Sequence, residues 1–539
     1  MKKYIVKSLL IAGLIGASSC DVTDLTPQNA LSEATAFTTP ERIELAVTGV
    51  YDAANSGFYL GGAVRGYPFG AAHVEQGDCR GEDVLNTQLF YAITYESTYD
   101  PTTANNDFHW QTLYALINRA NVVLAGLDKA VPTGTFTQAA IDAYKGECRF
   151  LRALAHHELL KHFARPYSDN PTAAMSGVPY RTLAVVGSES AAIAAAQGRN
   201  TTAECYDLLI ADLDYAESVL PETRANAGLK LTRATKAAAV ALKTRIYLHK
   251  ADYAKVVSEG NKLASQNVAP FSPAAGFGTY ALLANPFGPF GAGNKGNNES
   301  IFSIENSAED NPGVNGALPT MYNVSKTPVS GRGLVGISPV LWNQTWFLAS
   351  DARKSATFTD NDNVSSSGKG AKFTKKYADA TSRSDNAPVI RYAEVLLNMA
   401  EAIQRQAGGT PDARAFAMYN AVRSRSVADP ATDNIADFAT GNALIQAILN
   451  ERRIEFVSEG LRWGDIHRLA QDPTFGTNGI PAKCSRNISN YSALYTGDPA
   501  TTFATHAFIP YSDRRFVWPI PASETTINPV LAAQQNAGY

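Results

Sequence analysis

The stretch NERRIEFVSEGLRWGDIHRLA, residues 450–470, combines an apolar helical pattern with a regular row of carboxylates. Glu451, Glu455 and Glu459 recur every four residues, so on a helix they share one face and repel one another. Gly460 can adopt the left-handed conformation that ends a helix, and a second short helix carrying Trp463 is expected after it. Apolar residues at three- and four-residue steps predict the first helix: Leu444, Ile445, Ile448, Leu449, Ile454, Phe456 and Val457.

A helix retains such a row of glutamates only if cations lie nearby. The local candidates are Arg452, Arg453, Arg462 and Arg468. Two of the carboxylates could act as a general acid and base, or the whole set could be a structural ion-pair cluster that joins two helices. We favour the ion-pair interpretation, with Arg462 neutralising the glutamates. Its predicted members are Glu451, Arg452, Glu455, Glu459, Arg462 and Asp465.

The same segment resembles the C-terminal signature of the SusD/RagB family, which runs approximately E-R-R-x-E-F-x-x-E-G-x-R-x-x-D-x-x-R. Ten residues match this pattern: Glu451, Arg452, Arg453, Glu455, Phe456, Glu459, Gly460, Arg462, Asp465 and Arg468. Gly464 stands where the family often has a bulky residue, and Ala537 replaces a common proline in a similar C-terminal ending. The resemblance implies a surface lipoprotein that captures nutrients and is not an enzyme.

The N-terminus predicts export and lipid anchoring. Lys2, Lys3 and Lys7 precede a short apolar run that ends in small residues directly before Cys20. This pattern is typical of a lipoprotein signal over residues 1–19, with Cys20 lipidated and residues 20–38 as a tether. An ordinary secretory signal, with Cys20 incidental, is the alternative. The predicted location is the outer membrane, lipid-anchored and exposed at the cell surface.

Composition limits the possible partners. The formal charge is −3 and becomes −6 once the three signal-peptide lysines are removed, and there is no clustered basic face for nucleic acid. Charged residues make up 18% of the chain, while 24 Tyr and 23 Phe are abundant, which suits sugar- or peptide-binding surfaces. Four further cysteines could form two disulfides or none: Cys79, Cys148, Cys205 and Cys484.

Helical periodicity recurs along most of the chain and predicts a mainly helical, all-α fold. Helix pairs are expected over about 105–265 and 388–470, with an earlier helix from Thr39 to about Ala54. A loop-rich insertion over about 268–387 interrupts them and is too long to be a structureless connection. Residues 39–539 are treated as one domain. The family resemblance implies four tetratricopeptide-like helix pairs with loops packed on one side.

Motifs for catalysis or cofactors fail on spacing and context. His157 and His162 are five residues apart and point to different helix faces, so the zinc-protease pattern is not met. Two G-x-G-x-x-G matches, residues 291–296 and 331–336, lie in the loop-rich insertion without the strand and helix that a dinucleotide site requires. We therefore expect no metal, no cofactor and no catalytic residues.

Aromatic side chains beside amides and carboxylates fill two loop regions, residues 55–104 and the insertion. A sugar ring offers a flat C–H face to an aromatic plane and hydroxyl groups to amides and carboxylates, so this mixture suits a glycan. The predicted ligand-binding residues are Tyr67, Asp78, Tyr95, Tyr322, Trp342 and Trp346. Tyr95 and Trp346 are the expected stacking platforms, whereas Trp110 and Trp463 lie on periodic helix faces and are assigned to the scaffold. Pinning of irregular loops onto the scaffold is the alternative role for any one of these aromatics.

The implied function is capture of an oligosaccharide and its delivery to a SusC-like, TonB-dependent outer-membrane barrel. A neutral glycan is preferred because the loops carry few and scattered cations. Three alternatives remain open at this stage: a peptide-binding member of the same family, a secreted glycoside hydrolase or peptidase that uses loop carboxylates, and a helical scaffold that binds only protein.

Overall fold

The computed structural model describes residues 36–55, 65–134, 136–325, 331–355, 357–359, 368–486, 488–496 and 505–539. The lipoprotein signal, Cys20 and most of the predicted tether lie outside these residues. Among the described residues, no helix combines the length and the apolarity that a membrane span requires.

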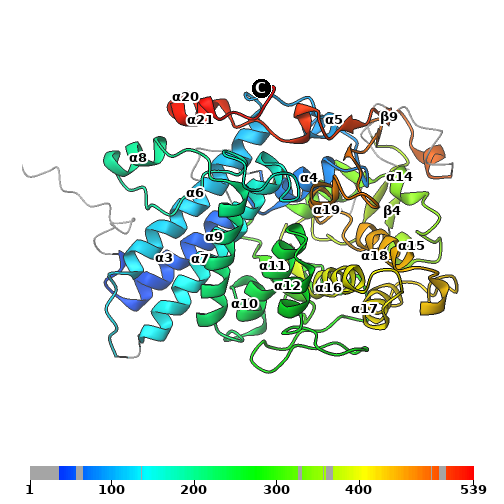
Figure 1. Ribbon diagram of the computed structural model, residues 1–539, viewed down its shortest axis with the longest axis horizontal. Coiled ribbons are helices and arrows are strands. Elements are labelled where there is room, and N and C mark those ends of the chain that lie inside the picture. The colour runs from blue at the N-terminus through cyan, green and yellow to red at the C-terminus, as the bar shows by residue number, and fades with distance from the viewer. Residues whose placement is uncertain are drawn as a thin grey trace, which may run out of the picture.

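A row of antiparallel helices forms the scaffold and crosses the molecule from α3 to α17 (Figure 1). Neighbours in the row pack side by side: α6 and α9 lie on α7, and α12 connects α11 to α16. Threonine side chains cap several N-termini, as Thr137, Thr201 and Thr235 do for α7, α9 and α11. The helices of the scaffold and the signature are α3 (Pro40–Asn55), α6 (Ala104–Leu127), α7 (Gln138–Phe163), α9 (Thr202–Val219), α11 (Lys236–His249), α12 (Tyr253–Gly260), α16 (Tyr392–Ala407), α17 (Ala413–Arg423), α18 (Gly441–Glu455) and α19 (Arg462–Leu469).

The mainly helical fold with paired helices matches the prediction, and the first predicted helix, Thr39 to about Ala54, is close to the observed α3. The end of α18 differs. This helix stops at Glu455 rather than at Glu459, because Ser458 and Gly460 both take positive φ, 69° and 76°. Glu459 therefore lies on the turn after the helix and is not the third member of a helical row. The next helix, α19, packs against α4 and α7.

Shorter helices occupy the loop regions, the periphery and the C-terminus. They are α4 (Ala71–Cys79), α5 (Ala92–Glu96), α8 (Ser188–Ala195), α10 (Ala227–Thr232), α13 (Leu318–Tyr322), α14 (Pro339–Trp342), α15 (Ala352–Ser355), α20 (Ala522–Ile527) and α21 (Pro529–Ala533), with 3-10 turns η2 (Ala292–Asn294), η3 (Ile435–Asp437), η4 (Ser492–Tyr495) and η5 (Arg514–Phe516). In Figure 1, α20, α21 and α8 lie together along one edge, next to the C-terminus.

Short antiparallel strands tie the loop-rich insertion to the rest of the chain. A four-stranded sheet has the order β1-β3-β5-β4, so β1 from the first loop region pairs with β3 from the insertion in the register Leu85↔Gly336. The insertion is thus attached to the first loop region through β3, and β2 pairs with β6 at the end of the insertion. The strands are β1 (Val84–Asn86), β2 (Ser300–Ile304), β3 (Val335–Ile337), β4 (Thr357–Thr359), β5 (Lys372–Thr374), β6 (Ala387–Arg391), β7 (Gly479–Ile480), β8 (Lys483–Cys484), β9 (Thr505–His506) and β10 (Ile509–Pro510), with pairs β2–β6, β7–β10 and β8–β9.

Both tryptophans assigned to the scaffold are buried, Trp110 in the main core of the helix row and Trp463 in a separate, smaller apolar cluster. Trp110 is fully buried in α6, and Trp463 is buried in α19, where its indole N–H donates to the carbonyl of Lys161 at 2.7 Å. The four cysteines Cys79, Cys148, Cys205 and Cys484 are buried free thiols, so neither possible disulfide forms in this structure.

Candidate functional site

The glutamates of the signature are buried and paired with cations from distant parts of the chain. Glu455 contacts Arg425 at 2.6 Å, Arg353 at 2.8 Å and Arg391 at 3.0 Å. Arg391 also reaches Glu459 at 2.7 Å. None of these cations lies in residues 450–470, so the local arginines were the wrong choice of partner for these carboxylates.

A second group of ion pairs joins α18, α19 and α16. Arg452 Nε lies 2.9 Å from Asp465, which also contacts Arg468 Nε at 2.9 Å. Arg468 continues to Glu401 on α16 at 2.6 Å. Burial alone would raise the pKa of Asp465, but Arg452 and Arg468 outweigh it and hold that pKa well below its ordinary value. These pairs lock the second helix of the signature onto the scaffold.

Arg462 does not neutralise the signature glutamates, contrary to the prediction. Its guanidinium binds Glu82 through Nε and Nη2, at 3.1 and 2.6 Å, and lies 3.3 Å from Asp83. Arg453 contacts the same two acids. Burial raises the pKa of Glu82, but Arg462 and Arg453 outweigh burial and lower that pKa to about 2. Arg462 thus joins the signature to the loop between α4 and β1.

Four of the six predicted ligand-binding residues are buried, so this part of the prediction is wrong. Tyr95, an expected stacking platform, is 1% exposed, and its hydroxyl donates to the carbonyl of Cys484 at 2.7 Å. Tyr322 donates to Asp78 at 3.0 Å, and Asp78 accepts the N–H of Gly460 at 3.0 Å. Tyr67 is 2% exposed and accepts from Gln76. These side chains pin the loops onto the scaffold and support the signature turn.

Beside this cluster, Glu75 is a fully buried carboxyl with no cation in contact among the described residues and with the Tyr91 hydroxyl as a polar neighbour. Burial raises the pKa of Glu75 well above its ordinary value of 4.5, so the folded protein holds a proton that the unfolded chain releases. The contribution of Glu75 to the unfolding free energy therefore falls as pH rises above about 4.5, by up to 1.4 kcal/mol per pH unit.

We expect Glu75→Gln to remove this dependence. The unfolding free energy of the variant relative to wild type should increase between pH 4.5 and pH 8 and should be flat below pH 4.5. Urea unfolding at several pH values measures the difference, and Glu189→Gln, at an exposed position, provides the matched control. A constant difference over the whole range would mean that Glu75 is ionised in the fold.

The two remaining predicted residues, Trp342 and Trp346, are only partly buried. Trp342 ends α14 and lines a cavity of about 490 Å³, which we call the Trp342 hollow. The Tyr495 ring lies 5.6 Å from the Trp342 ring at 86°, so the two aromatic rings form a corner. The other lining residues are Asn343, Ala349, Lys354, Ser355 and Thr496.

The Lys354 ammonium fixes the wall of the Trp342 hollow. It donates to the carbonyl oxygens of Trp342 and Phe347 at 2.6 and 2.7 Å and lies 5.1 Å from the Trp342 ring centre. Asn343 donates to the carbonyl of Leu494 at 2.6 Å, which attaches α14 to η4. Trp346 lies outside this hollow, with the Arg453 guanidinium 5.3 Å from its ring centre.

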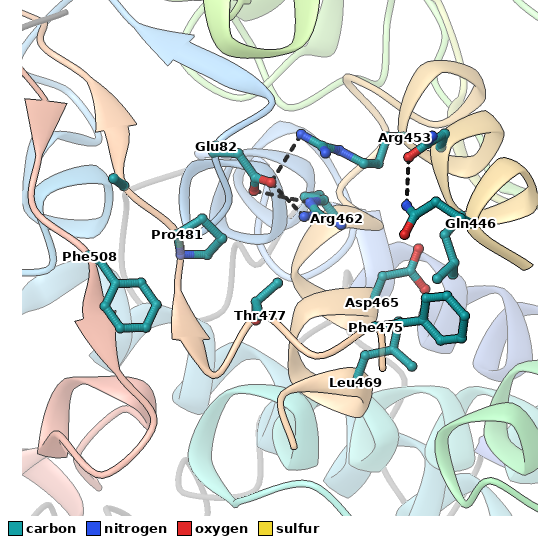
Figure 2. A pocket seen from close by; sticks show the side chains of 13 residues that line it. Glu82, Gln446, Arg453, Arg462, Asp465, Leu469, Phe475, Thr477, Pro481 and Phe508 are labelled. Atoms are coloured by element: carbon teal, nitrogen blue, oxygen red, sulfur yellow. Dashed lines mark hydrogen bonds and ion pairs between the residues drawn. The ribbon is translucent and has the colours of Figure 1, made fainter. Parts of the chain in front are cut away.

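A second cavity, of about 420 Å³, lies directly over the signature, and we call it the signature pocket (Figure 2). Figure 2 shows Phe508 and Phe475 at opposite sides of this pocket, with Glu82, Arg462 and Arg453 along the wall between them. Sequence reasoning missed both phenylalanines and Tyr495, because they lie after the signature, outside the two loop regions where aromatics are dense. The short pairing of β7 with β10 brings this segment back to α19.

A buried polar cluster holds the one group of described residues with metal-ligand geometry: His109, Glu158 and His162. The Arg80 guanidinium lies 3.1 Å from Nδ1 of His162. Because arginine can only donate, the ring proton of a neutral His162 is on Nε2, which donates to Glu158 at 3.0 Å. Lys161 also contacts Glu158, at 2.5 Å. With its lone pair engaged in this way, His162 acts as a packing residue, and His156 and His157 are buried as well.

Comparisons with known proteins agree with the fold and the signature. Residues 340–539 match the family model described as "SusD family", and residues 64–248 match the one described as "Starch-binding associating with outer membrane". The chain belongs to the SusD/RagB family. Members of this family are known as binding proteins rather than enzymes.

Individual relatives cover most of the chain. A SusD-like protein of Formosa agariphila is 27% identical over 407 residues, which cover 69% of this chain and 73% of that protein. A SusD superfamily protein from Bacteroides fragilis has a TM-score of 0.72 at 28% identity and covers 92% of this chain and 99% of its own. A solved SusD-like protein described as laminarin-binding shares the fold, with a TM-score of 0.63 at 20% identity over 93% of this chain and 99% of its own.

Proposed function

We propose that this protein captures a neutral oligosaccharide at the Trp342 hollow and passes it to a TonB-dependent barrel in the outer membrane. The observation that carries the proposal is the hollow itself, in which two aromatic rings meet at a right angle beside an amide and hydroxyl groups. Apolar walls with a few fixed polar groups are typical of small-ligand sites, and the volume is in their usual range. A relative described as laminarin-binding supports a glycan as the ligand.

The charge of the hollow favours a neutral ligand over an acidic one. Lys354 is the only cation among the described residues that line the hollow, and that ammonium already donates to two carbonyl oxygens. The Lys372 ammonium lies behind the lining, 5.5 Å from the Trp342 ring centre. Burial lowers the pKa of Lys354, which makes this ammonium a poorer partner for an anionic ligand. An acidic glycan would require several free cations, which the residues lining this hollow do not provide.

Delivery to a barrel and lipid anchoring are the finer parts of the proposal. They rest on the family, whose model names an association with the outer membrane, and on the sequence pattern that ends in Cys20. In this scheme the protein performs no chemistry and only changes the local concentration of the ligand. Co-purification of a TonB-dependent barrel with the lipidated chain from outer membranes tests the partnership.

Replacing Trp342 by Ala should weaken binding of laminarin oligosaccharides about fivefold to thirtyfold, which corresponds to about 1–2 kcal/mol of lost ring contact. Isothermal titration calorimetry measures the change, and Trp342→Phe should recover part of the affinity.

Trp346→Ala is the matched control, because that ring lies outside the hollow and faces Arg453. Unchanged affinity in Trp342→Ala together with a loss in Trp346→Ala would move the site to Trp346, as the sequence suggested. Release of shorter sugars by the wild-type protein at catalytic stoichiometry would instead support a glycoside hydrolase, and binding of peptides alone would support the peptide-binding alternative.

A further inference from the structure

The signature pocket has fixed hydrogen-bond donors that the fold does not use. Arg453 and Arg462 employ Nε and Nη2 in their contacts with Glu82 and Asp83. Nη1 of neither arginine has an acceptor among the residues that the structure describes, and the side chains are 16% and 14% exposed. Because two carboxylates already hold each guanidinium in place, these donors are preorganised and lose little entropy on meeting a ligand.

The charges around the signature pocket are balanced. Glu82 and Asp83 offset Arg453 and Arg462, while the Asp465 carboxylate is enclosed by arginines on its other side. An anionic ligand would lie close to the Glu82 carboxylate, and a cation would lie close to both guanidinium groups. A neutral ligand with many hydroxyl groups would be repelled by neither the carboxylate nor the guanidinium groups.

The apolar part of the pocket provides flat aromatic surfaces in the same cavity as these donors. Phe508 is 46% exposed, which is unusual for so large an apolar ring, and Phe475 lies across the pocket from it (Figure 2). Gln446 lies on the same side as Phe475, and its amide N–H donates to Asn450 at 3.0 Å, which leaves its carbonyl oxygen toward the opening as an acceptor. The phenylalanine rings could stack on the C–H face of a sugar. The guanidinium groups could donate hydrogen bonds to its hydroxyl oxygens, and the amide oxygen could accept one from a hydroxyl group.

We propose that the signature pocket binds a pyranose unit of a neutral glycan, as a second site that is separate from the Trp342 hollow. The two cavities share no lining residue. The inference rests on the proposed glycan-binding function and extends it, because two sites on one protein would hold a long glycan at two points and increase its effective affinity. Part of the family signature would then serve both the fold and the ligand.

The test uses the full-length folded protein and three neutral probes: laminarihexaose, maltohexaose and cellohexaose. In wild type, titration should show two sites for the probe that binds best, and Trp342→Ala should retain the weaker one. Adding Phe508→Ala to that variant should weaken the remaining binding at least fivefold. Phe508 is exposed, so its replacement should leave the thermal unfolding temperature unchanged.

Val131→Ala is the control, since Val131 is 73% exposed and lies outside both cavities. Residual binding in Trp342→Ala that Phe508→Ala does not change, or no residual binding at all, would overturn the second site and leave the first intact. If Phe508→Ala lost all binding while Trp342→Ala bound as tightly as wild type, the proposed function at the hollow would be overturned. The signature pocket would then be the ligand site. No binding of any probe by wild type would overturn both.

Discussion

Replacing Arg391 by Met is expected to lower the free energy of unfolding by about 3–5 kcal/mol, because it leaves buried carboxylates without their cation. The Arg391 side chain is 2% exposed and contacts Glu299 at 2.6 Å, Glu455 at 3.0 Å and Glu459 at 2.7 Å. Methionine fills a similar space but carries no charge. The decrease in the free energy of unfolding therefore measures the cost of leaving buried carboxylates without a cation, not the cost of a cavity. Urea denaturation monitored by circular dichroism measures it.

Two further measurements make this expectation specific. The deficit should shrink between pH 8 and pH 5, because stranded carboxylates acquire raised pKa values and can take up protons instead of keeping a buried charge. Arg515→Met is the matched control: its partner Asp513 is two residues away, the Arg515 side chain is 39% exposed, and such pairs contribute about 0–1 kcal/mol. A variant of Arg391 as stable as wild type would show that water or rearranged cations satisfy these acids.

Gly77→Ala should destabilise the fold by about 3 kcal/mol, since the new methyl group would overlap a backbone that cannot retreat easily. A Cβ at Gly77 in α4 would lie 2.1 Å from the carbonyl oxygen of Gly460. Gly460 itself has a φ of 76°, and a Cβ placed there would lie 2.8 Å from the α-carbon of Val74, so the two segments meet glycine to glycine. This contact brings the signature turn onto the first loop region.

Gly49→Ala provides the control in another helix. Nothing lies within 4 Å of a Cβ placed at Gly49 in α3, so alanine there should stabilise the protein by about 0.5–1 kcal/mol through its better helix propensity. Thermal unfolding of both variants by differential scanning calorimetry compares them directly. Equal effects in the two variants would mean that α4 shifts to accommodate the methyl group and that the close approach is not required.

The sequence by itself determined the helices and the family. Periodic apolar residues act over one or two turns, so a local pattern is enough to place α6, α7, α9 and α16, and to bury Trp110 and Trp463. The signature was equally readable, because its spacing of acids and arginines is a local feature. The end of α18 at Glu455 was not readable, since two residues with positive φ are held there by contacts such as that between Gly460 and Asp78.

Only the tertiary structure decided which charges pair and which aromatics face solvent. Arg462 lies 380 residues from its partner Glu82, and Arg391 lies 64 residues from Glu455, so no local spacing could connect them. Tyr95 and Trp342 both lie in aromatic-rich loops, yet one is enclosed by β8 and the other borders a cavity. Burial depends on which residues from distant parts of the chain pack against a side chain, and the local sequence around that residue does not determine them.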